Sequence, residues 1–446
     1  MNNGKLLILS LDGASWEGLK PFQEQGKLPI ISSLVSSGMS GPLSSMLPTF
    51  TYPNWGSFWT GQNPGRHGIF AFKELRSRGR LHQLVGWNSL KLPTWPELAH
   101  SRGFKMVSVY APLTYPPAKL NGLIVADQHM RNSRNFTHPA RLAGELRSRF
   151  GRVCPPKSEQ FFPPGGFRDS ESMREFVQKQ IQSVLQTGAI AEYLLKKPSW
   201  DICMVHFFAT DPLQHALWHL MDSGHPAFSA EGHQEIAKFF EALDTAIGRL
   251  IEEVKPGMVT LFSVHGFTAT RGILNLSRCL FDSLDRKPRG VFLDCKAIYV
   301  YNKIRENGAI TDILIQALQS LKDPSSGSHV IRRAWLAKEL YGFVSFPEWD
   351  VIVLEFNEGY TGRDGDLRAP LFKMCRPNRD YLIGTHTRKG LWLFCGKGVP
   401  ARGGLQTGIL DLPPTILNYL GVTVPEYMEG SPLPLFTSVM SGQKTE

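Results

Sequence analysis

Acidic and histidine side chains recur in this chain at spacings that suit a metal ion. Asp211 and His215 are four residues apart in the segment DPLQH. On a helix this spacing puts both side chains on one face, where one ion can bind both, and Pro212 fits a first helical turn. The pair therefore predicts a metal site. His219 shares the same face and is expected to be structural or to support the ligands, whereas His206 is predicted to be a satisfied core histidine.

Three more candidate ligands lie at the edges of apolar runs. Asp12 ends the first run of the chain, His265 ends a later one, and His386 stands in a GTHT segment just before the last. Taken alone, an aspartate beside a glycine is more often a turn or capping residue than a ligand. These residues therefore predict a metal site only if strands and helices bring them together in the fold.

The apolar runs have the length of buried parallel strands, and helical patterns alternate with them. The predicted strands are 5–11, 106–110, 202–208, 259–264 and 391–395, and the predicted helices are 176–195, 237–254 and 409–420. This alternation predicts an α/β fold with a doubly wound, mostly parallel sheet and helices on both faces. Sites in such sheets form at the carboxyl ends of strands, where Asp12, Asp211 and His265 would meet.

Residues 280–380 have a different pattern from the rest of the chain. They contain short strand-like pieces, one helix near 311–321, and joints rich in Pro, Gly and Ser. We predict a smaller α+β subdomain here, inserted into a catalytic core formed by 1–279 and 381–436. The polar tail 437–446 is expected to be flexible.

Composition bounds the class of protein. The chain has 446 residues, 42% of them hydrophobic and 20% charged, as in an ordinary globular protein. The net charge of +10 is spread along the sequence, so no nucleic-acid partner is expected, although the excess suits an anionic substrate. The densest basic cluster is Lys73, Arg76, Arg78 and Arg80. Six cysteines without a C-x-x-C pair do not indicate a disulfide framework.

The beginning of the chain does not read as a targeting segment. Its first apolar run is short and lacks a cleavage site, and no stretch approaches the roughly 18 apolar residues of a membrane helix. We therefore expect no membrane segment, a cytoplasmic protein and an intracellular substrate.

The segment 49–68, TFTYPNWGSFWTGQNPGRHG, is the most informative part of the chain. Thr51 precedes Pro53 and Asn54, a run of small residues follows, and PGRHG closes the segment. This pattern resembles the nucleophile segment of the type I phosphodiesterase/nucleotide pyrophosphatase family of the alkaline phosphatase superfamily. The resemblance extends over essentially the whole chain, for example to TYPP at 114–117.

The resemblance implies catalytic roles for Thr51 and Asn54 of this segment. Thr51 would lie between two metal ions and attack phosphorus, because coordination lowers the pKa of a hydroxyl and orients it. Asn54 would donate its amide to a phosphate oxygen as charge builds up. Thr49 is the other candidate hydroxyl, but the family spacing selects Thr51, which would otherwise be interpreted as a turn threonine.

The resemblance also implies two divalent ions, Zn²⁺ or alternatively Mn²⁺. The first would be bound by Asp211, His215 and His386, and the second by Asp12, His265 and Thr51. The family has an aspartate where this chain has Val264, which cannot bind a metal. The second site is therefore expected to be weak, completed by water, or empty.

The implied function is hydrolysis of phosphodiester or nucleotide pyrophosphate bonds through a phospho-threonine intermediate. The substrate would be small and phosphorylated, such as a nucleotide or a sugar-nucleotide. Two alternatives remain open: a degenerate relative that binds a phosphorylated ligand without turnover, and a phosphomonoesterase or phosphonate hydrolase on the same scaffold.

One further motif competes with this interpretation. Residues 375–379, CRPNR, match the C-x-P-x-R signature of sulfatases, which belong to the same superfamily. The sulfatase nucleophile, however, occupies the early position held here by Thr51, whereas Cys375 comes late in the chain. We therefore interpret the match as coincidental.

Overall fold

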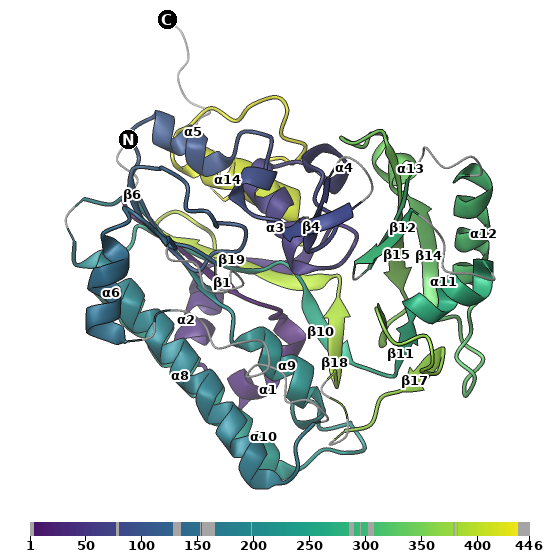
Figure 1. Cartoon of the computed structure of the whole chain (residues 1–446). Coiled ribbons are helices and arrows are strands. Elements are labelled where there is room, and N and C mark those ends of the chain that lie inside the picture. Colours follow the sequence, from purple (N-terminus) through teal and green to yellow (C-terminus); the bar gives the residue numbers. More distant parts are fainter. Residues whose placement is uncertain are drawn as a thin grey trace, which may run out of the picture.

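A nine-stranded sheet forms the centre of the fold in this computed structural model (Figure 1). In spatial order the strands are β20 (Thr407–Gly408), β2 (Met39–Ser44), β19 (Lys389–Gly396), β9 (Met258–Ser263), β1 (Leu6–Leu11), β8 (Ile202–Phe207), β5 (Met106–Val109), β6 (Gly122–Val125) and β7 (Thr137–His138). The structure describes residues 4–76, 80–127, 135–151, 153, 166–197, 199–284, 290–294, 296–301, 307–377, 380 and 382–435. The predicted tail and Arg78 lie outside these residues.

The middle of the sheet is parallel, which confirms the predicted fold class. Strands β9, β1, β8, β5 and β6 all run in the same direction. The predicted strand 391–395 lies within β19, which is antiparallel to both β9 and β2. Apolarity and length predicted a buried strand there, but neither property determines strand direction.

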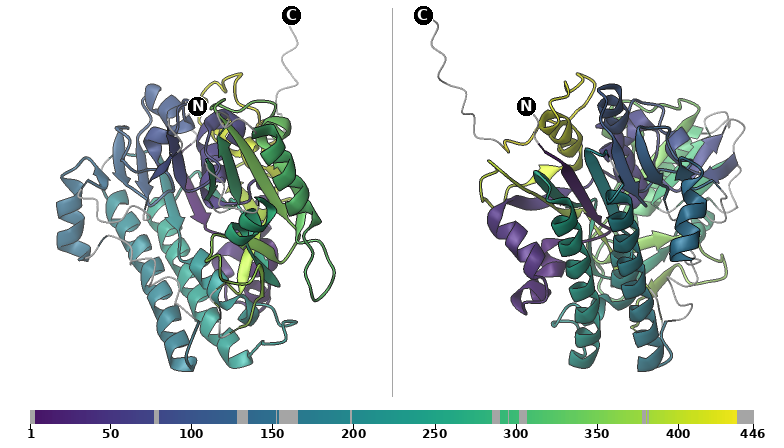
Figure 2. Two further views of the ribbon diagram at one scale, coloured as in Figure 1. Left: turned by 45° about the vertical axis from the view of Figure 1, so that its right-hand side comes forward. Right: turned by 90° about the vertical axis from the view of Figure 1, so that its left-hand side faces the viewer.

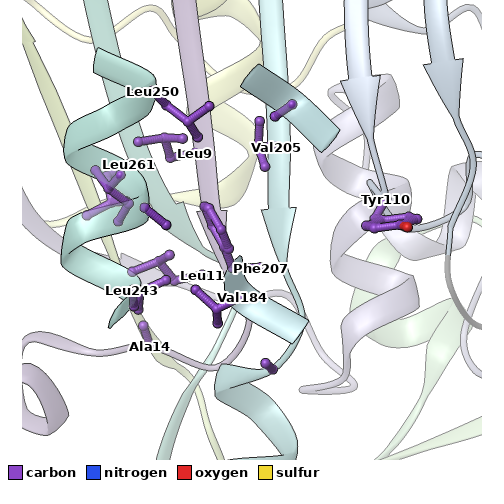
Figure 3. Packing of buried hydrophobic residues seen from close by; sticks show 14 of the residues in the cluster. Leu9, Leu11, Ala14, Tyr110, Val184, Val205, Phe207, Leu243, Leu250 and Leu261 are labelled. Carbon is purple, nitrogen blue, oxygen red and sulfur yellow. The ribbon is translucent and has the colours of Figure 1, made fainter. Parts of the chain in front are cut away.

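Both faces of the sheet are buried, and β1 shows why its sequence is continuously apolar. Leu7, Leu9 and Leu11 pack into one hydrophobic cluster, and Leu6 and Ile8 pack into a second cluster on the opposite face. Figure 3 shows the first cluster, in which leucines and valines from strands and helices interdigitate around β1. A strand that is covered on both sides cannot alternate between apolar and polar residues.

Helices cover the two faces separately (Figures 1 and 2). One layer contains α1 (Trp16–Glu24), α2 (Pro29–Ser37), α6 (Leu142–Phe150), α8 (Ser170–Leu195) and α10 (Ala230–Val254), and the other contains α3 (Thr51–Thr60), α5 (Trp95–Ser101) and α14 (Leu412–Tyr419). The long helices α8 and α10 pack side by side. The predicted helices 176–195 and 237–254 are therefore confirmed, and each begins earlier than its apolar pattern does. No helix among the described residues is both long and apolar enough to cross a membrane.

Smaller elements complete the core. The short helices are α4 (Pro64–His67), α9 (Thr210–Leu217), η1 (Trp87–Ser89), η2 (Trp218–Leu220) and η3 (Ile409–Asp411). Two short sheets pair β3 (Lys73–Arg76) with β4 (Arg80–Leu84) and β10 (Gly266–Ala269) with β18 (Gly384–Thr387). The four cysteines of the described residues are free thiols, and Cys154 and Cys295 lie outside them.

A second group of strands lies beside the core (Figure 1). One sheet has the order β12 (Val291–Asp294), β13 (Ala297–Tyr301), β15 (Trp349–Phe356) and β14 (Ile331–Leu336), and another has β16 (Tyr360–Arg363), β11 (Gly272–Asn275) and β17 (Phe372–Met374). The accompanying helices are α11 (Leu276–Leu284), α12 (Asn307–Ser320) and α13 (Ala337–Tyr341). The boundaries proposed for the inserted subdomain and the core stay a prediction.

Candidate functional site

The parallel strands bring the candidate ligands to one edge of the sheet. Asp12 follows β1 directly, and β1 lies between β8 and β9. Asp211 is the second residue of the helix that follows β8, and His265 lies two residues after the end of β9. The Asp12 carbonyl accepts a hydrogen bond from the Thr210 hydroxyl at 2.6 Å, which ties the ends of β1 and β8 together. The carboxyl ends of three strands therefore form one wall of the site.

Asp211, His215 and His386 form a first cluster of possible metal ligands. His386 Nε2 lies 3.0 Å from His215 Nε2 and 3.2 Å from Asp211 Oδ1, and His215 Nε2 lies 3.7 Å from Asp211 Oδ2. Atoms bound to one tetrahedral zinc ion are about 3.3 Å apart, so these separations fit such an ion. Two imidazole nitrogens at 3.0 Å also need a proton or a cation between them.

The ring of His215 is oriented by the protein backbone. Its Nδ1 lies 2.7 Å from the carbonyl oxygen of Gly384, next to His386 in β18. A carbonyl oxygen only accepts, so Nδ1 carries the hydrogen and Nε2 presents its lone pair to the cluster. This arrangement is typical of histidines that bind metals.

A second cluster contains Asp12, His265 and again Asp211. His265 Nε2 lies 3.4 Å from Asp12 Oδ1 and 3.2 Å from Thr51 Oγ1. Both oxygens of Asp12 are buried and have no hydrogen-bond partner among the described residues. A buried carboxylate is costly unless a cation or hydrogen bonds compensate for its charge, so this cluster also fits a metal ion.

Val264 contributes no ligand to the second cluster. Its side chain is 1% exposed and belongs to the hydrophobic cluster that includes Trp55 and Phe262. Asp211 is the carboxylate that belongs to both clusters. The position that lacks an aspartate is thus part of the apolar core, and Asp211 lies within reach of either site.

Burial keeps His265 and His386 neutral. Burial lowers the pKa of His265 to about 3, with a smaller contribution from the nearby His386. Burial also lowers the pKa of His386 well below its usual value, and His215 adds to this effect. A neutral imidazole is the form that binds a metal ion, so both residues are ready to act as ligands at neutral pH.

Thr51 is the first residue of α3, and its side chain is almost fully buried. Its hydroxyl is the one that lies beside His265, whereas the carbonyl of Thr49 bonds to Lys296. The first N–H groups of a helix favour a negative charge, so an anionic group beside Thr51 would be stabilised. The hydroxyl that contacts His265 is thus that of Thr51, and the choice of Thr51 as the nucleophile stays a prediction.

Asn54 supports the chain that leads into Thr51. Its amide nitrogen lies within 2.9–3.3 Å of the carbonyl oxygens of Phe50, Pro48 and Met46, and its oxygen accepts from the Met46 N–H. An amide nitrogen has only two hydrogens, and this residue is fully buried. The predicted bond to a phosphate oxygen would require these backbone bonds to break.

His67, in the PGRHG part of the segment, is structural. It donates from Nε2 to Ser57 Oγ at 3.1 Å, and its Nδ1 accepts from the Ile69 N–H at 3.2 Å. A Cβ at position 56 would lie 2.7 Å from the His67 ring, which explains Gly56. The small residues of the segment therefore make room for a buried imidazole.

The stability of the protein is expected to depend on pH through His67. Burial lowers the pKa of His67 to about 3, whereas an unfolded histidine has a pKa of about 6.5. Between these values the unfolded chain binds a proton that the folded chain does not, so acidification lowers the free energy of unfolding. In urea unfolding at pH 7, 6 and 5, the stability advantage of wild type over His67→Gln should shrink as the pH falls; a constant advantage would contradict the assignment.

His206 differs from its predicted role. It is 2% exposed, but its Nε2 has no hydrogen-bond partner among the described residues and lies 3.5 Å from Asp12 Oδ2. Its Nδ1 lies 3.2 Å from Ser10 Oγ. His206 is therefore a second imidazole beside Asp12 rather than a satisfied core residue. The sequence did not indicate this, because His206 lies within an apolar run that predicts a buried strand. His219 lies in η2 and belongs to neither cluster, in agreement with a structural role.

Cys375 belongs to neither cluster. Its thiol donates to the carbonyl oxygen of Leu382, and burial raises its pKa to about 12. A thiol with that pKa is not a nucleophile at neutral pH. Asn378 and Arg379, the other residues of the sulfatase-like match, lie outside the described residues.

A cavity of about 440 Å³ opens next to the first cluster. Among the residues that line it are His386, Thr49, Lys296, Arg332, Arg388 and Tyr360. Its volume is typical of a pocket for a small ligand. Lys296 and Arg332 come from the second group of strands, which carries no motif that sequence reasoning could use.

Comparisons with known proteins agree with this architecture. Residues 6–370 match the model of the family type I phosphodiesterase / nucleotide pyrophosphatase. A search of curated protein sequences returned no significant match.

Solved structures with similar folds include two kinds of enzyme. Human ectonucleotide pyrophosphatase/phosphodiesterase 5 is 15% identical, with 96% of this chain and 97% of that chain covered and a TM-score of 0.57. Phosphonoacetate hydrolase from Sinorhizobium meliloti 1021, in complex with phosphonoformate, is 15% identical, with 93% and 95% covered and a TM-score of 0.63. An inactive variant of the murine phosphodiesterase in complex with AMP is 16% identical, with 94% and 96% covered and a TM-score of 0.56. At this identity the likeness shows a shared fold.

Proposed function

This chain belongs to the type I phosphodiesterase / nucleotide pyrophosphatase family, and we propose that it is a metal-dependent hydrolase of phosphodiester or nucleotide pyrophosphate bonds. The observation that carries the proposal is the Thr51 hydroxyl, 3.2 Å from His265, beside two ligand clusters that share Asp211. A candidate nucleophile, candidate metal ligands and a pocket thus lie close together, and this arrangement supports the proposal.

Each residue of the site has a proposed role. Asp211, His215 and His386 hold one divalent ion, and Asp12, His265 and Asp211 hold a second beside Thr51. When bound, such ions supply charge stabilisation for phosphate oxygens and lower the pKa of a coordinated hydroxyl. Zinc is the ion that this set of histidines and carboxylates fits best, with manganese as the alternative.

In the proposed reaction, the Thr51 oxygen forms a bond to phosphorus as the bond from phosphorus to the leaving group breaks. The hydroxyl proton of Thr51 passes to the solvent, and the leaving group departs with the bonding electrons. A water oxygen then bonds to phosphorus as the bond from phosphorus to the Thr51 oxygen breaks; a proton returns to that oxygen, and the phosphoryl product is released. Asn54 has a positioning role in this proposal, because its hydrogen bonds hold the backbone segment that leads into Thr51.

Two alternatives use the same site. A protein that binds a phosphorylated ligand without turnover is favoured by Val264, and phosphonate hydrolysis is favoured by the similar fold of phosphonoacetate hydrolase. The test is hydrolysis of bis-p-nitrophenyl phosphate by purified protein with added Zn²⁺ or Mn²⁺. Metal-dependent release of p-nitrophenolate supports the phosphodiesterase. Its absence from folded, metal-loaded protein, together with turnover of phosphonoacetate, would favour the phosphonate reaction; absence of both favours binding only.

Restoring a carboxylate at position 264 should strengthen the second metal site. Val264→Asp places a carboxylate directly before the candidate ligand His265 in the chain, and we expect zinc affinity to rise by about tenfold or more, the scale on which the groups around a metal change its affinity. The same change buries a charge in an apolar cluster, so the metal-free variant should be less stable than wild type and should recover with zinc.

Competitive titration with a chromophoric chelator measures this affinity, and Val264→Asn is the uncharged control of similar size. Equal zinc affinity in wild type and Val264→Asp would mean that another group already fills the ligand position.

A further inference from the structure

Lys296 brings a positive charge into the protein next to the candidate metal clusters. It lies in the turn between β12 and β13, and its ammonium crosses to the core to donate to the carbonyl oxygen of Thr49 at 3.2 Å. The residue is only 8% exposed. Lysine is rarely buried to this extent without a specific reason, because removing its charge from water is costly.

Lys296 lines the cavity that opens next to the first cluster of candidate ligands. Thr49 and His386 line the same 440 Å³ cavity. Thr49 is two residues before the proposed nucleophile, and its carbonyl fixes the position of the ammonium. Lys296 therefore shares the cavity with a member of the first cluster and with the segment that leads into Thr51.

The other cations of the cavity differ from Lys296. The side chains of Arg332 and Arg388 are 69% and 48% exposed, and both lie within 4 Å of Glu355. Their charges are screened by water and partly balanced by this carboxylate. Lys389, which also lines the cavity, is exposed as well. Lys296 is therefore the most buried cation of the cavity, and it lines the cavity together with His386.

We propose that Lys296 binds a second anionic group of the substrate, next to the phosphoryl group that reacts at Thr51. The preferred substrates would then carry a phosphate or a carboxylate close to the reacting phosphorus, as in pyrophosphates and phosphonocarboxylates, rather than two uncharged ester groups. This inference rests on the proposed function, and it names the class of substrate for the same site.

A purely structural role for Lys296 makes a different prediction. If its ammonium only anchored the β12–β13 turn to Thr49, its loss would affect all substrates and ligands equally. If it binds an anion, its loss should act selectively on molecules with the second charge. The comparison between paired ligands therefore separates the two roles.

The kinetic test compares Lys296→Met, which keeps the length of the side chain, with Lys296→Arg, which keeps the charge. Zinc-loaded enzymes would be assayed with bis-p-nitrophenyl phosphate, thymidine 5′-triphosphate and phosphonoacetate. For Lys296→Met we expect kcat/KM to fall at least about tenfold more for one of the two anionic substrates than for bis-p-nitrophenyl phosphate, the worth of one hydrogen bond to a charged group. Lys296→Arg should recover part of this loss. Lys338→Met, at an exposed lysine of α13, is the matched control.

A binding test keeps the inference separate from the proposed function. In a zinc-loaded Thr51→Ala background, calorimetry would compare thymidine 5′-diphosphate with thymidine 5′-monophosphate, and phosphonoacetate with methylphosphonate. Lys296→Met should weaken the first member of at least one pair by about tenfold more than the second. The pair that responds identifies phosphate or carboxylate as the group bound.

The outcomes are distinct. Equal losses for both members of each pair, or no loss at all, would overturn the role of Lys296. A wild-type enzyme without turnover on any substrate, but with a selective loss of binding in Lys296→Met, would overturn the hydrolase and leave the anion site standing.

Discussion

Replacement of Thr51 by alanine is expected to abolish hydrolysis while folding and metal content persist. The change removes the oxygen that would bond to phosphorus, and the remaining catalytic groups cannot replace a nucleophile. We expect kcat to fall by at least about 10³-fold, the scale found when a nucleophile is deleted from an enzyme. The measurement is the rate of p-nitrophenolate release from bis-p-nitrophenyl phosphate at saturating zinc.

Two neighbouring variants sharpen this test. Thr49→Ala is the same substitution at a buried threonine two residues earlier, and it should lose far less activity because the hydroxyl that contacts His265 is that of Thr51. Thr51→Ser keeps an oxygen at the same position and should retain part of the rate. Zinc content and circular dichroism should match wild type in all three. Turnover of Thr51→Ala at the wild-type rate would remove Thr51 from the mechanism.

The sequence predicted the parts of the fold that depend on local patterns. Continuous apolar runs predicted β1, β8 and β9, because strands covered on both faces need apolar residues at every position. The four-residue spacing of Asp211 and His215 predicted their common helix face, and both lie in α9. The meeting of Asp12, Asp211 and His265 at one edge was predicted because parallel strands place their carboxyl ends together, whereas the order of the strands in the sheet was not predicted.

The features that were missed depend on contacts between distant segments. His206 looks like a core residue within β8, and only the pairing of β8 with β1 brings its ring to Asp12. Lys296 reaches Thr49 across 247 residues of sequence. The Asn54 amide donates hydrogen bonds to carbonyl oxygens before Thr51, and these bonds likewise depend on the path of that segment. No periodicity or motif encodes such contacts, so a single sequence does not predict them.

Because Val264 cannot bind a metal, the other residues of the site would have to supply the negative charge around a second ion. A metal ion held by Asp12, His265 and Thr51 alone would have a single carboxylate ligand, that of Asp12. The first ion would likewise have a single carboxylate, that of Asp211. Asp211 lies within 4.8 Å of the ligand atoms of Asp12 and His265 as well as within the first cluster. A carboxylate close to both ions would replace part of the negative charge that an aspartate at position 264 would supply.

Replacement of Asp211 by asparagine is therefore expected to weaken both metal sites. Asparagine keeps the shape of the side chain and removes its charge. Affinity should fall by more than about 100-fold at each site, because the loss of groups that only support a ligand already costs about 10–100-fold. Equilibrium dialysis against zinc, with metal content measured by mass spectrometry, gives the number of ions bound and their affinities.

The controls distinguish a shared ligand from an ordinary one. His386→Gln removes a ligand of the first cluster alone and should leave one ion bound at its original affinity. Asp222→Asn makes the same change at an exposed residue just beyond η2 and should leave both ions in place. If Asp211→Asn also retained one ion with unchanged affinity, Asp211 would serve a single site. The position of an aspartate at residue 264 would then have to be taken by a water molecule or by the substrate itself.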